Sequence, residues 1–274
     1  MKIGIFTSTF VRPTLEETMD AIVSHGLNSV QFNMKSAGLD DMPTHIDDKL
    51  CDRIRSTLAT RHIELSVLSG TFNMIHPDLK ERAEGMRSLN TLAAACRRLG
   101  SGIISLCTGT RSRDSMWRRH PDNDSPEAWA EMIRSMDEAV QIAETHHVTL
   151  AFEPEVNNVV DTADKARRLV DEIASPYLKV LIDGANIFHA GELSRMQDIL
   201  DHAFQVLGDD IVMAHAKDLS RDGDAGHEAA GTGMLDYDHY IHLLQSMDFK
   251  GSLILHSLEE HQTEKCLSFV RGKM

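Results

Sequence analysis

The chain has 274 residues, of which 42% are hydrophobic and 26% are charged, and its formal net charge at pH 7 is -14. This composition is typical of a globular protein with enough apolar material for a large core. So strong a negative charge repels phosphate backbones, which argues against bulk nucleic-acid binding.

Other features of the sequence bear on the compartment. The first ten residues, MKIGIFTSTF, lack the long apolar run of a signal peptide, and no stretch approaches the ~18 apolar residues of a membrane span. The cysteines show no CxxC spacing, so we expect buried thiols in a reducing cytosol; they are Cys51, Cys96, Cys107 and Cys266. We therefore predict a cytoplasmic protein, without a membrane partner, that forms one domain over residues 1–274.

Short apolar or β-branched runs recur along the chain and predict eight strands. The runs begin at Lys2, Ser29, Ile63, Gly102, Val148, Leu178, Ile211 and Ser252. Between them lie segments with apolar residues three and four apart, which predict helices, for example over 14–26, 124–147, 161–174 and 236–247. Because parallel strands need crossover connections, eight strand–helix units in a chain of this length predict a single (β/α)8 TIM barrel. A doubly wound open sheet is the alternative.

Polar residues stand at the ends of the last four predicted strands, and this end of a TIM barrel carries the active site. In chain order they are Glu153 and Glu155, Asp183 and Asn186, His215, Lys217 and Asp218, and finally His256. Two carboxylates and two imidazoles from successive strand ends would suit manganese, cobalt, zinc, iron or magnesium, and the absence of cysteine argues against a closed structural zinc site. Taken singly, such residues are often helix caps or turns, and the chain holds 15 histidines.

The runs AFEPEVNN, LIDGANIFHAGE and MAHAKD, in this order and spacing, resemble the xylose isomerase-like sugar isomerase and epimerase superfamily of TIM barrels. The stretch TLEETMDAIVSHGLNSVQF is similar to the first unit of that family, so the resemblance covers essentially the whole chain. It implies metal ligands at Glu153, Asp183 and His215. It does not name a substrate, because these barrels host isomerases, epimerases, dehydratases, decarboxylases and an endonuclease.

The chain departs from the family pattern at two positions. His256 stands where the epimerases carry a final glutamate ligand, and Asn186 stands where many relatives carry a substrate-binding histidine. In those epimerases two glutamates act on opposite faces of the substrate, so this chain lacks half of that pair unless Glu259 or Glu260 folds back. We expect His256 to be the fourth ligand or a proton carrier, and Asn186 to contact substrate.

A divalent ion that chelates a carbonyl oxygen and a neighbouring hydroxyl would stabilise an enediolate and ease removal of the proton between them. We expect Glu153 to be the base, with Glu155 as a reserve or a substrate contact. Lys217 is expected to point away from the site while its strand continues and to enter it where the loop begins, where its ammonium would help an oxyanion. A salt bridge with Asp218 or another carboxylate is the alternative.

Three loops are expected to shape the site. Asn73 and His76 follow the third strand and are predicted substrate contacts, and the loop before the last strand carries His227 and Glu228 as lid candidates. The loop after the fourth strand holds Trp117 and four arginines: Arg111, Arg113, Arg118 and Arg119. Because guanidinium groups bind carboxylates and phosphates in a bidentate way, we predict that Arg111 and Arg118 bind an anionic sugar. A solvated or subunit-contacting loop is the alternative.

The sequence thus favours a metal-dependent isomerase or epimerase that acts on a small-molecule sugar, sugar phosphate or sugar acid. A lyase or decarboxylase acting on a keto sugar acid is the alternative. An abasic-site endonuclease and a non-enzymatic sugar-binding barrel are less favoured. A homo-oligomer is compatible with the sequence, which shows no interface.

Overall fold

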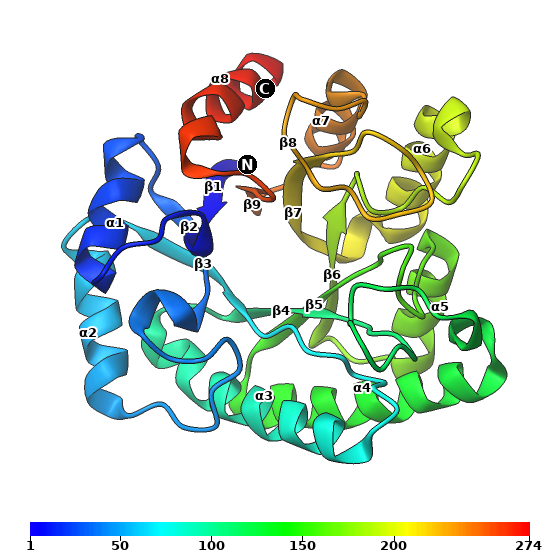
Figure 1. Cartoon of the computed structure of the whole chain (residues 1–274), viewed down its shortest axis with the longest axis horizontal. Coiled ribbons are helices and arrows are strands. Elements are labelled where there is room, and N and C mark those ends of the chain that lie inside the picture. The colour runs from blue at the N-terminus through cyan, green and yellow to red at the C-terminus, as the bar shows by residue number, and fades with distance from the viewer.

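The computed structural model describes residues 1–274, and its strands close into a barrel surrounded by helices (Figure 1). The barrel strands are β1 (Lys2–Phe6), β2 (Ser29–Phe32), β3 (Glu64–Ser69), β4 (Ile103–Cys107), β5 (Thr149–Glu153), β6 (Leu178–Asp183), β7 (Ile211–Asp218) and β9 (Ser252–Leu255). Each pairs in parallel with its neighbours in this order, and β9 pairs with β1 to close the ring. The predicted (β/α)8 barrel is therefore confirmed, and closure excludes the open sheet.

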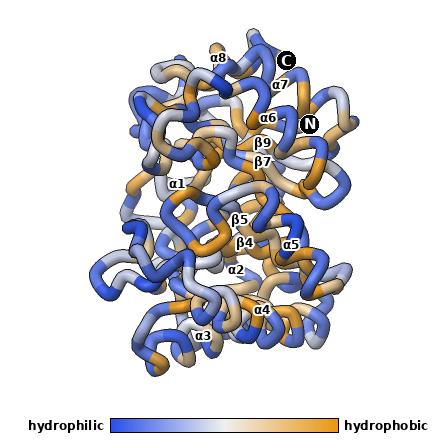
Figure 2. Tube along the Cα trace, turned by 90° about the vertical axis from the view of Figure 1, so that its right-hand side faces the viewer, coloured by the Kyte–Doolittle hydropathy of each residue, from blue (hydrophilic) through white to orange (hydrophobic).

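Helices follow the strands and form the outer layer (Figure 1). They are α1 (Leu15–Ser24), α2 (Asp48–Ala59), α3 (Leu79–Leu99), α4 (Pro126–His146), α5 (Ala163–Ile173), α6 (Met196–Leu207), α7 (Tyr237–Ser246) and α8 (Thr263–Lys273). Several start where the sequence supplies an N-cap: the Thr14 hydroxyl accepts from the Glu17 amide, and the Ser125 hydroxyl accepts from the Ala128 amide. Figure 2 shows hydrophobic residues along β4, β5, β7 and β9 and hydrophilic residues on the outer loops.

A small apolar cluster fills the inside of the barrel and forms the floor of the site. Its members are Val67, Ala151, Leu181, Met213 and Ile254, from β3, β5, β6, β7 and β9. Side chains two positions apart on a strand share a face. The residues two positions beyond the last four members must therefore point into the barrel above this floor; they are Glu153, Asp183, His215 and His256.

The cysteines lie where the sequence placed them. All four cysteines are buried and none forms a disulfide, with Cys107 in β4 and the others in helices. No helix is long and apolar enough to cross a membrane. A two-residue strand that was not predicted, β8 (Glu228–Ala229), pairs antiparallel with the end of β7 and fixes the loop that follows it.

Candidate active site

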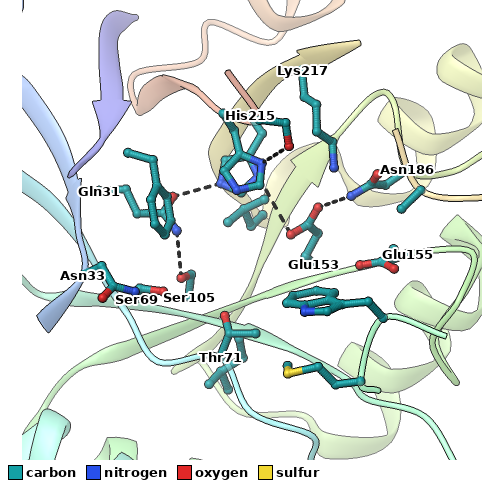
Figure 3. Close-up of a pocket in the computed structure, with 18 of the residues that line it drawn as sticks. Gln31, Asn33, Ser69, Thr71, Ser105, Glu153, Glu155, Asn186, His215 and Lys217 are labelled. Atoms are coloured by element: carbon teal, nitrogen blue, oxygen red, sulfur yellow. Dashed lines mark hydrogen bonds and ion pairs between the residues drawn. The ribbon is translucent and has the colours of Figure 1, made fainter. Parts of the chain in front are cut away.

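A cavity of about 500 Å³ opens at the carboxyl ends of the barrel strands (Figure 3). Its polar lining includes Glu153, Glu155, Asn186, His215, Lys217 and His256, all predicted from the sequence. Figure 3 shows Glu153, Glu155, Asn186 and Lys217 on one side, with Gln31 and Asn33 across the cavity. The charged groups of β5 and β7 therefore face a neutral polar wall made by β2 and the residue after it.

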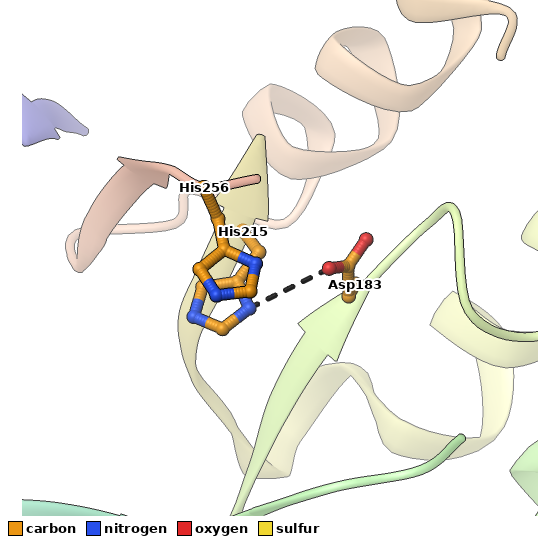
Figure 4. A group of neighbouring side chains, drawn as sticks. All are labelled: Asp183, His215 and His256. Atoms are coloured by element: carbon orange, nitrogen blue, oxygen red, sulfur yellow. Dashed lines mark ion pairs between the residues drawn. The ribbon is translucent and has the colours of Figure 1, made fainter. Parts of the chain in front are cut away.

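Three side chains at the ends of neighbouring strands lie close enough to hold a metal, and two of them, His215 and His256, line the cavity (Figure 4). One ligand atom each from Asp183, His215 and His256 lies within 4.8 Å of the others. Asp183 Oδ2 and His215 Nδ1 are buried, lie 3.5 Å apart and have no hydrogen-bond partner. Glu153 Oε2 lies 3.8 Å from the same Nδ1 atom. Buried polar atoms are nearly always satisfied, so this group of oxygens and nitrogens fits a divalent cation.

Gln31 orients the His215 ring. His215 Nε2 lies 2.9 Å from Gln31 Oε1, and the Gln31 amide donates to Ser105 Oγ at 3.3 Å. Because a carboxamide oxygen only accepts, Nε2 carries a proton, which leaves Nδ1 to face Asp183. Metal-binding histidines are commonly held by such a bond on the second nitrogen. The sequence analysis missed Gln31, although an amide inside the apolar run SVQF was a signal for it.

Asn186 links Glu153 to the loop after β7. Its Nδ2 donates to Glu153 Oε1 at 2.5 Å, and its Oδ1 accepts from the Gly226 amide at 3.0 Å. These two bonds fix the orientation of the amide, since each of its ends has one compatible partner. Nearby, Asn157 Nδ2 donates to Asp224 Oδ1 at 2.8 Å, which holds the same loop. Asn186 therefore contacts a predicted catalytic group as well as lining the cavity.

Lys217 enters the cavity directly from the strand. Strand β7 runs to Asp218, and Lys217 lies on the same face as His215 because the two are two residues apart. The expectation that a continuing strand would turn it away was wrong. Its ammonium lies 3.2 Å from Asp183 Oδ2 and is buried. Asp218 points elsewhere and accepts backbone amides of the following loop, including those of Gly231 and Leu235.

The buried charges shift one another's pKa values. Burial opposes ionisation of Asp183, but Lys217 and His215 outweigh it and hold the pKa of Asp183 well below its usual range. Burial likewise opposes protonation of His215, but the nearby carboxylates of Asp183 and Glu153 raise its pKa to about 9. Burial, then His215 and Lys217, lower the pKa of His256 well below its usual value. Without a metal, one of the two imidazoles is charged and the other is neutral.

Glu155 is a second carboxyl group on the Glu153 side of the cavity. It is buried, and its Oε1 atom has no hydrogen-bond partner. Burial, followed by repulsion from Glu153, raises the pKa of Glu155 to about 8. Glu155 is therefore held as the acid at neutral pH.

The predicted arginines lie outside the cavity lining. Arg111 pairs with Glu131 of α4 at 2.5 Å, and the exposed Arg118 lies 3.3 Å from Asp114. Arg119 bridges Asp124 and Asp161. The same loop instead presents Met116 and Trp117 to the cavity, so its apolar residues form part of the wall.

Two further loops differ in their contact with the cavity. Asn73 and His76 do not line it: the Asn73 amide bonds to the backbone of Thr110, and His76 caps the Asp78 amide. His227 does line it, whereas Glu228 pairs with Asp218 in the short β8 ladder. Glu259 and Glu260 lie away from it, paired with His261 and Arg12 respectively.

Three solved structures show the same barrel. The 3-keto-D-glucoside 4-epimerase YcjR from E. coli has a TM-score of 0.74, with 16% identity over 99% of both chains. The probable 3-DHS dehydratase AsbF from Bacillus anthracis has a TM-score of 0.74, with 15% identity over 99% of this chain and 98% of that one. The IolI protein with a bound zinc atom has a TM-score of 0.73, with 17% identity over 100% of this chain and 96% of that one.

At these identities the three likenesses show the fold alone. None of the curated proteins matches the sequence. The family described as the xylose isomerase-like TIM barrel matches residues 19–271, which is nearly the whole chain. The chain therefore belongs to the xylose isomerase-like TIM-barrel family.

Proposed function

We propose that this chain is a divalent-metal-dependent enzyme that moves a proton next to a carbonyl group of a sugar or sugar acid, as isomerases and epimerases do. The observation that carries the proposal is the convergence of Asp183, His215 and His256 within metal-binding distance of one another, beside the cavity that Glu153, His215 and His256 line. The similarity in fold to a 3-keto-D-glucoside epimerase supports the same class of substrate.

Asp183, His215 and His256 would hold the metal, with Glu153 as the fourth donor beside them. When bound, such an ion polarises a carbonyl group and stabilises negative charge on its oxygen. A mixed set of nitrogen and oxygen donors suits zinc, manganese, cobalt or iron better than calcium. The zinc atom in the IolI structure agrees with this choice.

The chain supplies a base and a cation around the substrate. Glu153 would take the proton from the carbon next to the carbonyl group, because it borders the cavity while Asn186 holds one of its oxygens. The buried Lys217 ammonium, on the same side, would stabilise negative charge on a substrate oxygen. Glu153 would then return the proton to the neighbouring carbon, and transfer of the hydroxyl proton to the former carbonyl oxygen would complete an isomerisation.

A lyase is the second candidate, and the position of Glu155 favours it. Glu153 and Glu155 lie on one side of the cavity (Figure 3), and the residue after β9 that lines it is His256, not a carboxylate. A base and an acid on one side suit an elimination, in which one group removes a proton from carbon and the other protonates the leaving hydroxyl. One structure of similar fold is a probable dehydratase.

The proposal is tested by metal content and proton exchange. Protein purified without chelator should hold close to one divalent ion per chain, and it should exchange the proton beside the carbonyl of a ketose in D2O, as followed by NMR. Glu153→Gln should abolish exchange, whereas the exposed and distant Glu259→Gln should not.

Absence of metal, even after manganese or zinc is added, would reject the metal-dependent enzyme. Exchange that persists in Glu153→Gln would reject Glu153 as the base. Release of water from a hydroxy-ketone, seen as a new unsaturated product, would favour the lyase over the isomerase.

A further inference from the structure

The active-site cavity adjoins a second groove at the same end of the barrel. This groove has a volume of about 590 Å³ and lies between the loops after β2, β3 and β4 and the start of α3. Asp41, Thr71 and Met116 line both spaces, so the cavity and the groove share a wall. A ligand bound beside Glu153 therefore has the groove as its neighbouring space.

The groove carries polar groups of both signs that the protein leaves free. Arg113 lines it and makes no side-chain hydrogen bond or ion pair, whereas the other three arginines of its loop each pair with a carboxylate. Glu81 lines it and has no ionic partner, and Glu84 lies 3.6 Å from Arg87 in an exposed pair. Free donors and free acceptors side by side suit hydroxyl groups, which both donate and accept. A strongly charged ligand would meet like charge on one wall.

Each of the two spaces is large enough for a sugar ring. At about 30 Å³ per water molecule, the groove has room for roughly 20 waters, and a hexose has about 12 non-hydrogen atoms. The cavity beside the predicted metal ligands is of similar size. Trp117 lines the cavity with 52% of its surface exposed, and it offers an apolar ring against which a sugar could pack.

We propose that the substrate is a neutral glycoside: its reacting sugar occupies the cavity, and its second sugar lies in the groove lined by Glu81, Glu84, Arg87 and Arg113. The assignment of the reacting sugar to the cavity rests on the function proposed above. The binding of the second sugar in the groove is independent of that function, because it depends on shape and on hydroxyl recognition.

Calorimetric titration of the metal-loaded protein tests this proposal. The probes are D-fructose and four glycosyl-fructoses that differ in the position of the glycosidic oxygen: turanose, lactulose, leucrose and palatinose. At least one disaccharide should bind about tenfold or more tightly than fructose. Glu84→Trp and Arg87→Trp, which fill the groove from α3, should reduce that preference to within about twofold while fructose still binds. Ala83→Trp, an exposed neighbour outside the groove, should keep the preference.

Equal binding of fructose and all four disaccharides would overturn the proposal, and so would a preference that survives both groove-filling variants. Binding of none of these sugars would overturn it as well. The proposed function is judged separately, by metal content and exchange on fructose. Proton exchange without a preference for a disaccharide would reject the second-sugar site and support the proposed enzyme activity. A preference for a disaccharide without proton exchange would support the second-sugar site and reject the proposed activity.

Discussion

The imidazole rings of His215 and His256 stack face to face, with centroids 4.7 Å apart and planes inclined by 14°. Phe6 meets the His256 ring edge-on, at 5.2 Å between centroids. Two stacked imidazolium ions would repel each other. The pKa of His215 is raised and that of His256 is lowered, so the two rings are not both charged. His256 is therefore neutral, which is the form in which histidine binds a metal.

Substitution of His256 should change metal affinity according to the donor that replaces it. His256→Ala removes a donor and should weaken metal binding. The loss should exceed about 10- to 100-fold, which is the usual effect of losing a residue that only orients a ligand. His256→Glu supplies a carboxylate at the same place and should keep much of the affinity. A chelator competition titration measures both. Unchanged affinity in His256→Ala would show that His256 is a proton carrier and not a ligand.

Asn186 should act as a positioning residue for Glu153. In Asn186→Ala the Glu153 carboxylate loses its donor and the Gly226 amide loses an acceptor. We expect kcat to fall about 10- to 100-fold with a smaller change in KM, since general-base catalysis contributes about 10²–10⁴-fold in all. Hydrogen exchange around Gly226 should rise in parallel. The closer mimic Asn186→His, which can still donate, should recover part of kcat; no recovery together with normal exchange would contradict this role.

The sequence predicted the barrel and the inward-facing acids and imidazoles because both depend on local patterns. A strand with period two places Glu153 on the same face as Ala151, and His215 on the same face as Met213. The same rule would have placed Lys217 inside, because it lies two residues beyond His215. The prediction for Lys217 was wrong because the alternation of side chains along the strand was applied incorrectly, and the sequence itself held the information needed.

The loops were less predictable because their side chains are fixed by distant partners. Arg111 turns away from the cavity since Glu131, twenty residues along and on α4, offers a carboxylate. No local pattern indicates that pairing. For the same reason, the sequence could not show that Trp117 and Met116 would form the wall instead, because that arrangement follows from where the arginines are held.

Removal of Lys217 should destabilise the metal-free protein more than the metal-bound protein. Its ammonium is the buried cation nearest to Asp183, and loss of one partner of a buried ion pair costs about 3–5 kcal/mol. In Lys217→Met a divalent ion would replace the missing charge, so added zinc or manganese should raise Tm more in the variant than in the parent protein. Thermal unfolding with and without metal measures the difference. An equal rise in the two proteins would show that the metal does not compensate for the lost cation.

A pH dependence of stability should arise at the opposite end of the barrel, at Asp210. Burial opposes its ionisation, but Lys179 and Arg167, the latter at 2.6 Å, outweigh it and hold the pKa of Asp210 below its ordinary 3.8. A lowered folded-state pKa contributes stability above the unfolded pKa, and this contribution is lost as the pH falls through the folded value. Asp210→Asn should therefore cost about 1–3 kcal/mol at pH 7.

The cost of Asp210→Asn should shrink progressively once the pH falls below about 3.8, because the carboxylate of the unfolded parent protein is protonated first and that of the folded protein only at a lower pH. Urea unfolding at a series of pH values measures it. Asp209→Asn is the matched control, since this exposed neighbour has no ion-pair partner and should change stability by less than about 0.5 kcal/mol at any pH. A cost of Asp210→Asn that stays constant down to acid pH would show that its side chain matters through its shape and hydrogen bonds, and not through its charge.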